Sequence, residues 1–536
     1  MVRKEIKKIT EKAIKKFYKE KIEVKIERPS EMVFGDYATN VAMIIAKQIK
    51  KNPLEIAENL KFQIQPYGEF AQGRPANFKS GYFDKIEAVK PGFINFFLSK
   101  KYLQEQVSEI LKQKEKFGGL ILGKNKKINI EFISANPTGP LTLGNGRGGF
   151  CGDVLANVLA KAGYKTFREY YINDVGEQVK KLGHSVIGDS ETIYKGDYIF
   201  DLRKKVKGDN PEKVGEQAAK IILEEMIKPS TKKMGIKFDV WFSEKSLYQK
   251  KEVDKVLEQL KNKNLCYKKQ GALWFKSTNF GDDKDRVLIK ANGEKTYFAS
   301  DIAYLKNKIS RGFDVLIYFW GADHYGYVAR LKAAAQALGY KKEQLHIIVS
   351  QLVRLFADGK EMRMSKRTGN YTTLDELIDE VGLDIARFFF LIRNNDTHLN
   401  FDLDLAKEQS EKNPVFYIQY AHARICAILR KCGKLEIRNP KSENLKLLNH
   451  PSELNLIKQL IRFPEIIEDI ANDYQVQRLP LYAIDLAASF HQFYRDCQVL
   501  TGDRPLLEAR TGLILATKIV LKNTLDLMGI SVPPKM

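Results

Sequence analysis

The stretch Glu131–Phe150, EFISANPTGPLTLGNGRGGF, decides the fold of this chain. A short β-rich run, KINIEFIS, leads into it, and a helical run continues from Arg147 through Ala162. The next segment, GYKTFREYYIND (163–174), is strand-like. This order of strand, glycine loop, helix and strand is the usual beginning of a parallel nucleotide-binding sheet. The glycines let the backbone approach a phosphate, and the start of the helix offers unpaired N–H groups.

The glycines of this loop allow more than one interpretation. Gly144, Gly146 and Gly149 match Gly-x-Gly-x-x-Gly, which taken alone indicates a dinucleotide site of a dehydrogenase, with Glu169 as a ribose ligand. The Asn-Pro-Thr-Gly-Pro insert lengthens the turn beyond the tight one that such a site needs, and Glu169 follows slightly late. A third interpretation is that the glycines serve only a tight turn.

A second loop lies far downstream, in FADGKEMRMSKRTGNYTTLDELIDEVG (Phe356–Gly382). It places Arg363, Lys366 and Arg367 around Met364 and Ser365, and a helical run follows. Clustered cations on a glycine-flanked loop suit a triphosphate whose charge redistributes during attack at its α-phosphorus. A solvated charge run is the alternative for any few of these residues, but Met-Ser-Lys followed by Thr-Gly-Asn and a helix is more specific.

The pattern along the chain predicts three domains. Residues 1–115 are expected to form an N-terminal α+β domain, with a helix over Glu5–Lys19, the alternating segment KIEVKIERP, a helical run through Asp36–Lys50 and a strand over Val89–Ser99. The charged, glycine-containing patch Lys112–Lys127 is expected to be the linker. Residues 116–395 are expected to hold the parallel sheet, with a mostly helical insertion at about 178–260 and strands at 286–291, 315–322 and 346–355. Residues 396–536 are expected to be all-helical.

Composition narrows the class of protein. The 536 residues contain 89 Lys and Arg against 66 Asp and Glu, a net charge of +23, which suits a polyanionic partner such as RNA but also a solvated lysine-rich surface. The five cysteines form no C-x-x-C pair, which argues against a zinc knuckle and a disulfide framework. No apolar run approaches the roughly 20 residues that span a bilayer, and no signal peptide is evident. We therefore expect a soluble, cytoplasmic protein without membrane contact.

Several segments together resemble arginyl-tRNA synthetases of the bacterial type over nearly the whole chain. In the first half they are FGDYATNVAMIIAK (34–47), KPGFINFFLS (90–99), SANPTGP (134–140) and YYINDVGEQ (170–178). In the second half they are DRVLIKANGEKTYFASDIAY (285–304), YFWGADHYGYVARLKA (318–333), NPVFYIQYAHARI (413–425), FHQFYRDCQVL (490–500) and LDLMGISVPPKM (525–536).

The resemblance implies a fold and a reaction. The fold would be a class I Rossmann-type catalytic domain with a parallel sheet, an N-terminal α+β domain that contacts tRNA and a C-terminal all-α anticodon-binding domain. The reaction would convert arginine and ATP, with Mg²⁺, to arginyl-adenylate and then transfer the arginyl group to the 3′ end of tRNA(Arg). In this family the first step usually needs tRNA. A zinc site is not implied, and the chain is expected to be a monomer.

The resemblance also implies site residues. Arginine would be bound by Glu131, Ser134, Asn136, Tyr297, Asp301 and His324. ATP would be bound by Gly144, Gly146, Asp323, Met364 and Lys366, and the catalytic set would be Thr142, Gly144, Asn145, Arg363, Ser365 and Lys366. Tyr417, Tyr420, Phe490 and Tyr494 are candidates for stacking on anticodon bases, with Arg424 on phosphates and Met536 facing the anticodon. Since most aromatic residues at helical spacing are core, one or two of these four are expected to contact RNA. Ordinary structural roles are the alternatives for His324 and for Asp301, as a helix N-cap.

One signature departs from the family pattern. Where the family has His-x-Gly-His, this chain has Thr142, Leu143, Gly144 and Asn145, and Arg363 stands where Lys is frequent. Loss of one preorganised donor to a transition-state oxyanion typically costs about 10²–10³ in rate. Two accounts follow: an active enzyme in which Asn145, Lys366 and Arg363 serve the phosphate, which we favour because the other motifs are intact, or a divergent paralogue that binds tRNA or arginine without efficient activation. A binding-only RNA protein would show salt-dependent tRNA affinity without ATP use.

Overall fold

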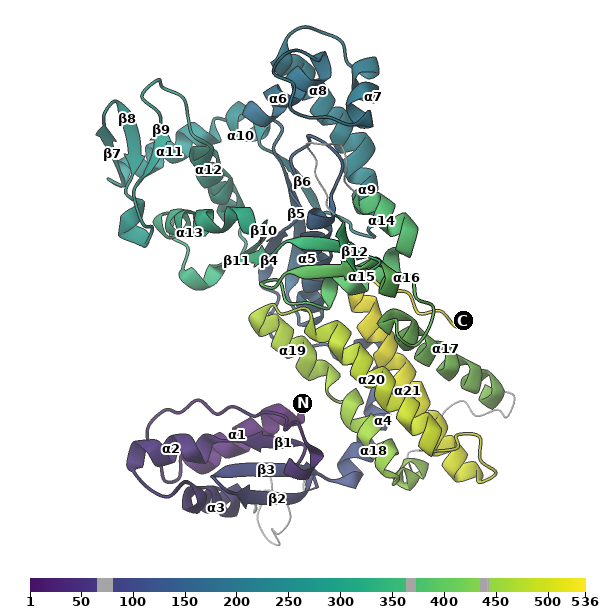
Figure 1. Ribbon diagram of the computed structural model, residues 1–536. Helices are drawn as coiled ribbons and strands as arrows, with labels where there is room; N and C mark the ends of the chain where they lie inside the picture. The colour runs from purple at the N-terminus through teal and green to yellow at the C-terminus, as the bar shows by residue number, and fades with distance from the viewer. Residues whose placement is uncertain (65–80, 363–372, 434–440, 442) are drawn as a thin grey trace.

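The computed structural model describes residues 1–64, 81–362, 373–433, 441 and 443–536, and shows an elongated molecule with a separate N-terminal lobe (Figure 1). The N-terminal domain contains α1 (Val2–Ile14), β1 (Tyr37–Thr39), α2 (Val41–Ile49), α3 (Pro53–Ile64), β2 (Phe83–Val89) and β3 (Phe93–Leu98). Its strands form an antiparallel sheet in the order β1-β3-β2.

Two predictions for this domain are wrong. The helix predicted through Asp36–Lys50 is divided, because residues 37–39 pair with β3 and leave only Val41–Ile49 helical. The alternating segment KIEVKIERP makes a single bridge, Glu27 to Ala38, rather than a strand.

The central domain is built on a five-stranded parallel sheet in the order β11-β10-β4-β5-β6. Its strands are β4 (Lys127–Glu131), β5 (Lys165–Ile172), β6 (Val240–Ser243), β10 (Val315–Gly321) and β11 (Leu345–Ser350). The long helix α5 (Leu143–Lys161) connects β4 to β5 and packs on the sheet. The strand, loop, helix and strand predicted from the sequence are therefore confirmed.

A short strand interrupts the helical insertion expected at about 178–260. Its helices are α6 (Glu177–Ile187), α7 (Asp197–Lys205), α8 (Pro211–Ile222) and α9 (Lys228–Lys233). Within the predicted range, however, VWFS (240–243) is the edge strand β6, which pairs in parallel with β5. Because the strand is four residues long and lies between charged helices, helical periodicity concealed it.

A second lobe lies beyond β6, with its own apolar core. It contains α10 (Lys245–Gln249), α11 (Glu252–Asn262), α12 (Tyr297–Ser310), α13 (Val328–Ala337) and an antiparallel sheet of β7 (Cys266–Lys269), β8 (Ala272–Phe275) and β9 (Arg286–Ile289). The strand predicted at 286–291 is thus outside the parallel sheet. The segment predicted as one strand at 346–355 is two, β11 and β12 (Val353–Ala357), and β12 belongs to a third sheet with β13 (Lys360–Met362) and β14 (Leu399–Asp402).

The C-terminal part is mostly helical, but the prediction that residues 396–536 are all-helical is wrong at β14, which pairs with β12. Its helices are α14 (Leu374–Val381), α15 (Leu383–Leu391), α16 (Leu403–Lys407), α17 (Pro414–Gly433), α18 (Pro451–Leu460), α19 (Phe463–Asp473), α20 (Arg478–Asp496) and α21 (Arg504–Met528). Helix α4 (Lys100–Gln113) connects the N-terminal domain to the core and packs along α21. The predicted linker after Lys112 is not a free tether, since the Asn523 side chain donates to the carbonyls of Lys114 and Phe117.

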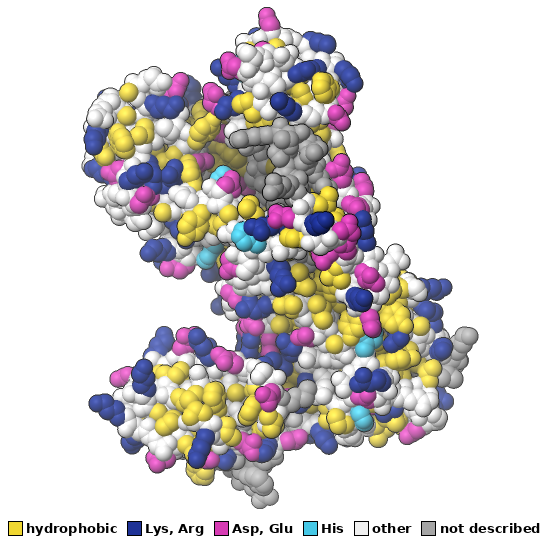
Figure 2. Space-filling view, viewed as in Figure 1, with side chains coloured by type: hydrophobic (Ala, Val, Ile, Leu, Met, Phe, Trp, Pro, Cys, Tyr) yellow, Lys and Arg dark blue, Asp and Glu magenta, His cyan; other side chains and the backbone are white. Residues whose placement is uncertain are grey.

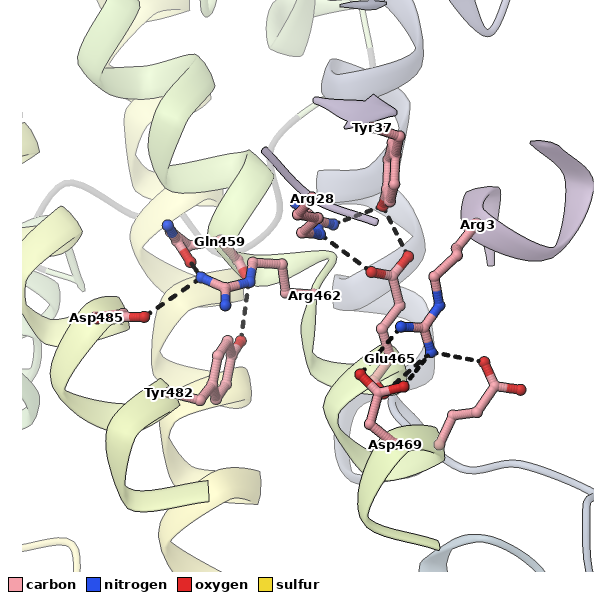
Figure 3. Close-up of polar contacts among 10 residues, drawn as sticks. Arg3, Arg28, Tyr37, Gln459, Arg462, Glu465, Asp469, Tyr482 and Asp485 are labelled. Carbon is pink, nitrogen blue, oxygen red and sulfur yellow. Dashed lines mark hydrogen bonds and ion pairs between the residues drawn. The ribbon is translucent and has the colours of Figure 1, made fainter. Parts of the chain in front are cut away.

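The N-terminal domain is held against α19 by buried charges (Figure 3). The Tyr37 hydroxyl donates to Glu465 Oε1 at 2.7 Å, and Arg28 Nε donates to Glu465 Oε2 at 3.1 Å. Arg3 binds Asp469 at 2.7 Å and Glu468 at 2.9 Å. These contacts fix the N-terminal domain to the same helical bundle that contacts α5.

The face shown in Figure 2 carries Lys and Arg side chains over every lobe, interspersed with acidic ones. No single basic face stands out in this view, so the charge of +23 by itself does not locate a polyanion. Among the described residues, no helix is long and apolar enough to cross a membrane.

Candidate active site

The signature loop ends in a capped helix. Thr142 is the N-cap of α5, and Asn145 Oδ1 accepts hydrogen bonds from the Thr142 backbone N–H at 2.9 Å and from its hydroxyl at 3.0 Å. The two residues at the histidine positions therefore bond to each other. Since the oxygen of the Asn145 amide is occupied, its NH₂ group is the part that can donate to a ligand.

The three glycines that match Gly-x-Gly-x-x-Gly have different roles. Gly144 is exposed, and a Cβ there would meet only the Thr142 hydroxyl, at 3.8 Å, so that the backbone is open to a ligand. Gly146 is buried, and a Cβ would lie 2.8 Å from Leu374. Gly149 is closed by Met234 at 2.6 Å. The structure thus gives Gly146, expected to bind ATP, a packing role, and only Gly144 keeps the open backbone that phosphate binding needs.

Glu169 is not available to a ribose, which removes the main support for the dinucleotide interpretation. Its carboxylate is fully buried and accepts two hydrogen bonds from Arg311, at 2.6 and 2.7 Å. The Tyr304 hydroxyl and the Asn129 amide donate to it as well, each at 2.7 Å. Although burial opposes ionisation, the charges of Lys308 and Arg311 hold the pKa of Glu169 below its usual range.

Glu131, expected near the arginine ammonium, lies at the carboxyl end of β4. Its Oε2 accepts from Lys308 Nζ at 2.6 Å and from the Tyr304 hydroxyl at 2.9 Å, whereas no bond to Oε1 is formed by the described residues. Lys308 is itself fully buried. One carboxylate oxygen of Glu131 is therefore bonded within the protein core, and the other is available to a ligand.

The backbone turns sharply directly after this strand. Ile133 and Ser134 both have positive φ, 67° and 38°, a conformation that costs about 1–3 kcal/mol for such residues and is concentrated at functional sites. The Ser134 hydroxyl accepts from the Tyr171 backbone N–H at 3.1 Å, and Asn136 is exposed. The turn thus directs the SANPTGP segment, with Ser134 and Asn136, away from the end of β4.

Two acids beside this turn have no cationic partner. Asp301, in the first turns of α12, accepts from the Tyr327 hydroxyl at 2.6 Å, and Glu244, directly after β6, is buried with Tyr171 and Ser300 beside it. No Lys or Arg of the described residues forms an ion pair with either acid. Burial raises the pKa of Asp301 to about 6, with a further contribution from Glu131. Burial and the charge of Asp301 raise the pKa of Glu244 to about 7.

A cavity of about 390 Å³ opens at Glu244, which lines it, whereas Asp301 lies beside Glu244 and is not among the lining residues. It is lined by Val175, Gly176, Glu244, Lys245, Tyr248, Gln249 and Tyr297. Tyr297 is 53% exposed and its hydroxyl accepts from the Glu177 backbone N–H at 3.3 Å. Glu244 on the wall, with Asp301 beside it and two tyrosines around the opening, suits a cationic group with planar hydrogen-bond donors; Lys245 also lines the cavity.

His324 and Asp323 lie on the 3₁₀ turn Ala322–Tyr327 at the end of β10. Both side chains are largely exposed, and His324 Nε2 lies 3.3 Å from Asp323. The His324 ring is 6.0 Å from the Trp320 ring. The structure therefore does not bury His324 as a core histidine, but no described contact ties it to Asp301 or Glu244.

Arg363, Met364, Ser365, Lys366 and Arg367 lie outside the described residues. The chain on the far side of them returns to the signature loop, because the Leu374 N–H donates to the Leu141 carbonyl at 3.0 Å. Thr373 forms a bridge with Thr142. The end of the Met-Ser-Lys segment is therefore anchored at the start of α5.

A larger groove of about 1050 Å³ lies in the helical C-terminal part. Tyr420, Arg424, Tyr494 and Met536 line it, together with Arg430, Lys431, Arg495 and Lys535. The Arg424 guanidinium lies 4.5 Å from the Tyr420 ring centre and 4.8 Å from that of Tyr494. Two half-exposed aromatic rings among cations are the elements that bind unpaired bases.

Comparison with known proteins assigns each part of this architecture. The model described as the arginyl tRNA synthetase N terminal domain matches residues 2–98, that of the class I (R) catalytic domain matches 106–185 and 189–422, and that of the DALR anticodon binding domain matches 418–536. The arginine–tRNA ligase of Carboxydothermus hydrogenoformans is 46% identical over 95% of this chain and 94% of its own, and that of Caldanaerobacter subterraneus is 45% identical over 99% and 98%. The chain belongs to the arginyl-tRNA synthetase family.

The fold agrees with this assignment. The structure of the Thermus thermophilus arginyl-tRNA synthetase superposes with a TM-score of 0.78 over the full length of both chains, at 22% identity. The synthetase thus consists of the family's N-terminal domain, a class I catalytic domain with a parallel sheet, and a helical anticodon-binding domain.

Two of the expected RNA contacts of the synthetase need correction. Phe490 is fully buried in the helical core and cannot stack on a base. Tyr417 is partly buried, with its ring 4.6 Å from that of His491, and does not line the groove. Tyr420 and Tyr494 line the groove and remain candidates for contact with RNA.

Sequence reasoning missed Glu244 in the synthetase. It lies in FDVWFSEKSLY, within the range assigned to the helical insertion, where an acid among charged residues resembles a solvated helix face. The available signal was VWFS, a β-rich run followed by an acid, which marks the carboxyl end of a parallel strand where ligands bind.

Proposed function

We propose that this chain charges tRNA(Arg) with arginine in two steps. A carboxylate oxygen of arginine attacks the α-phosphorus of ATP and pyrophosphate leaves. The terminal ribose hydroxyl of tRNA(Arg) then attacks the carbonyl carbon of the arginyl-adenylate, and AMP leaves. As a class I synthetase the chain uses ATP; Mg²⁺ would accompany the phosphates of the nucleotide.

The observation that carries the choice of arginine is the unpaired acid couple Asp301 and Glu244. A guanidinium has five N–H donors in one plane and remains charged at every physiological pH. Bound between the two carboxylates, its single positive charge offsets their mutual repulsion. Tyr297 covers the open side of the pocket, and the free Oε1 of Glu131, with Ser134 and Asn136, would receive the ammonium and orient the carboxylate.

The nucleotide would lie over Gly144 at the start of α5. There the open backbone admits a phosphate, and the first N–H groups of the helix favour negative charge. Asn145 is the side chain that can donate to the α-phosphate as charge develops on its oxygens, and Thr142 holds it in place. Lys366, Arg363, Ser365 and Met364 would complete the triphosphate site from the second loop, with Asp323 and His324 on the ribose side.

The anticodon would lie in the groove of Tyr420 and Tyr494. Two bases can stack on these rings, while Arg424 lies between the rings and Met536 closes one end. The groove wall carries four further cations and no acid among its described lining residues, which suits a folded RNA strand.

A second function has one observation in its favour. Thr142 and Asn145 satisfy each other, as an ordinary capped helix would, and no histidine of the chain stands at the signature positions. A paralogue that binds tRNA or arginine without efficient activation would look the same at this point.

Pyrophosphate exchange into ATP with arginine, measured with and without a tRNA(Arg) transcript, separates the two functions. We expect arginine-dependent exchange in the presence of the tRNA, and Asn145→Ala should lower kcat about a hundredfold because one donor to the oxyanion is lost. Absence of exchange under every condition, with arginine binding retained in calorimetry, would establish the paralogue instead.

A further inference from the structure

Arg147 is a buried cation without an acid partner. It lies in the second turn of α5, it is fully buried, and no described Asp or Glu forms an ion pair with it. Its Nη1 donates to the Gln351 carbonyl at 3.0 Å and its Nη2 to the Asn394 carbonyl at 2.6 Å. Its Nε has no partner among the described residues. A desolvated charge held only by carbonyls is expensive, so an apolar side chain would stabilise the fold better.

The two carbonyls lie where the segment between β11 and β12 passes the segment before β14. This crossing, formed by residues 350–351 and 394–395, supports the third sheet. Gln351 lies between β11 and β12, and its N–H donates to the Asn395 carbonyl at 2.8 Å. Ser350 Oγ donates to the side chain of Asn395 at 3.1 Å. The crossing leads on one side into β12 and β13 and on the other into β14, which pairs with β12. Arg147 therefore binds the base from which the β12–β13 hairpin projects.

The hairpin is the last described structure before the Met-Ser-Lys residues. β13 ends at Met362, and Arg363 follows it in the sequence. On the other side of these residues, Leu374 is bonded to Leu141, next to the N-cap of α5. Both described ends of the segment are thus anchored on the beginning of α5, the first through Arg147 and the second through Leu141.

We propose that Arg147 is a positioning residue for adenylate formation: its guanidinium fork sets the place of the β12–β13 hairpin relative to Gly144. The inference rests on the proposed function, since it assigns a role in the reaction of that same site. The planar fork matters because it spans two carbonyls at once, which a lysine ammonium on a flexible stem does not do in one fixed geometry. Misplacement of reacting groups by about 1 Å from a distant change can cost about a hundredfold in rate.

The test is Arg147→Lys in the full-length protein, assayed by pyrophosphate exchange with a tRNA(Arg) transcript. We expect kcat to fall about tenfold to a hundredfold, while the KM for arginine changes less than about threefold, because Arg147 forms no hydrogen bond with a described residue that lines the acid pocket. Arg387→Lys is the matched control: Arg387 is equally buried and also donates to two carbonyls, those of Met234 and Met528, but it has Asp153 as a partner. Its kcat should stay within about threefold of the parent.

Hydrogen exchange gives a readout that does not need activity. In Arg147→Lys, amides of 353–362 should exchange at least about tenfold faster, whereas those of α1 should not change. Ser350→Ala loosens the same crossing without touching Arg147 and should move both readouts in the same direction, which keeps the test decisive if Arg147→Lys folds poorly. Unchanged kcat and unchanged exchange at 353–362 would overturn the proposal. If the parent shows no pyrophosphate exchange but the amides of 353–362 still exchange faster in Arg147→Lys, the proposed function fails. Arg147 then anchors the hairpin without a role in catalysis.

Discussion

Two groups of buried acids lie near the carboxyl ends of neighbouring strands, and they are treated in opposite ways. Glu169 on β5 is bonded to Arg311, Tyr304 and Asn129 at once. Asp301 and Glu244 receive hydroxyl contacts and form no ion pair with a described Lys or Arg; the charge of Arg330 only partly offsets the raised pKa of Asp301. The pKa of Glu169 lies below its usual range, whereas those of Asp301 and Glu244 are raised to about 6 and about 7.

The difference separates structural charge from binding charge. An acid whose cation is built into the chain contributes to folding and has nothing left for a ligand. An acid couple that lacks its cation destabilises the empty protein and stabilises a complex with a cationic ligand, because the ligand supplies the missing charge. The comparison predicts that substitution of an unpaired acid lowers activity, whereas substitution of a paired acid lowers the stability of the fold.

The largest effect is expected for arginine use in Asp301→Asn. Neutralising one partner of a buried charge pair costs about 2–5 kcal/mol, so kcat/KM for arginine should fall about a thousandfold in pyrophosphate exchange. The variant should fold as well as the parent or better, since an unpaired buried charge is removed. Glu294→Gln, an exposed acid of the same lobe paired with exposed Lys290, is the control and should leave the constant unchanged. A fall of less than tenfold in Asp301→Asn would show that the guanidinium binds elsewhere.

For the free energy of unfolding we expect the reverse order: changing the paired acid Glu169 should cost more than changing the unpaired acid Glu244. Glu169→Gln leaves Arg311 partly buried without its partner, and we expect a loss of about 3 kcal/mol in the free energy of unfolding, measured in urea. Glu244→Gln, which removes an acid without a cation, should be neutral or stabilising at pH 8. If both variants lose equal stability, the distinction between paired and unpaired acids is wrong.

The smallest expected effect is the number of protons released when arginine binds. At pH 6.5 part of the Asp301 and Glu244 population is protonated in the free protein, because their pKa values are raised to about 6 and about 7. Arginine binding needs both acids ionised, so it should release protons and strengthen about a hundredfold from pH 5.5 to pH 7.5. Calorimetry in buffers of different ionisation enthalpy measures the release.

The stability of the folded protein depends on the pH in the opposite direction to arginine binding for these two acids. A raised acid pKa contributes stability at low pH that is lost as pH rises through the folded-state value of about 6 to 7, whereas the lowered pKa of Glu169 contributes stability that is lost as pH falls through it. In Asp301→Asn the proton release at pH 6.5 should shrink. Arginine affinity that is independent of pH between 5.5 and 7.5 would contradict the assignment of these two acids.

Local pattern predicted part of this architecture, and physical context decided the rest. The order of β4, α5 and β5 followed from periodicity because each element is long and its turn chemistry is distinctive. Glu244 did not, since the four residues of β6 carry too little alternation to be separated from the helices around them. Phe490 and Tyr494 show the same limit: they are one helical turn apart on α20, yet one is fully buried and the other is 40% exposed. The spacing of aromatic residues along a helix does not reveal which turn of the helix is covered by the core and which faces the groove.

The contact between Tyr37 and Glu465 joins residues 428 positions apart. During translation at about 5–20 residues per second, roughly 20 to 90 s separate the appearance of the two partners. Throughout that interval Arg3, Arg28 and Tyr37 are on a finished domain with no acid to receive them. The N-terminal domain therefore has to fold and stay soluble as an independent unit at the ribosome, with an interface meant for α19 exposed to water until the last quarter of the chain has been made.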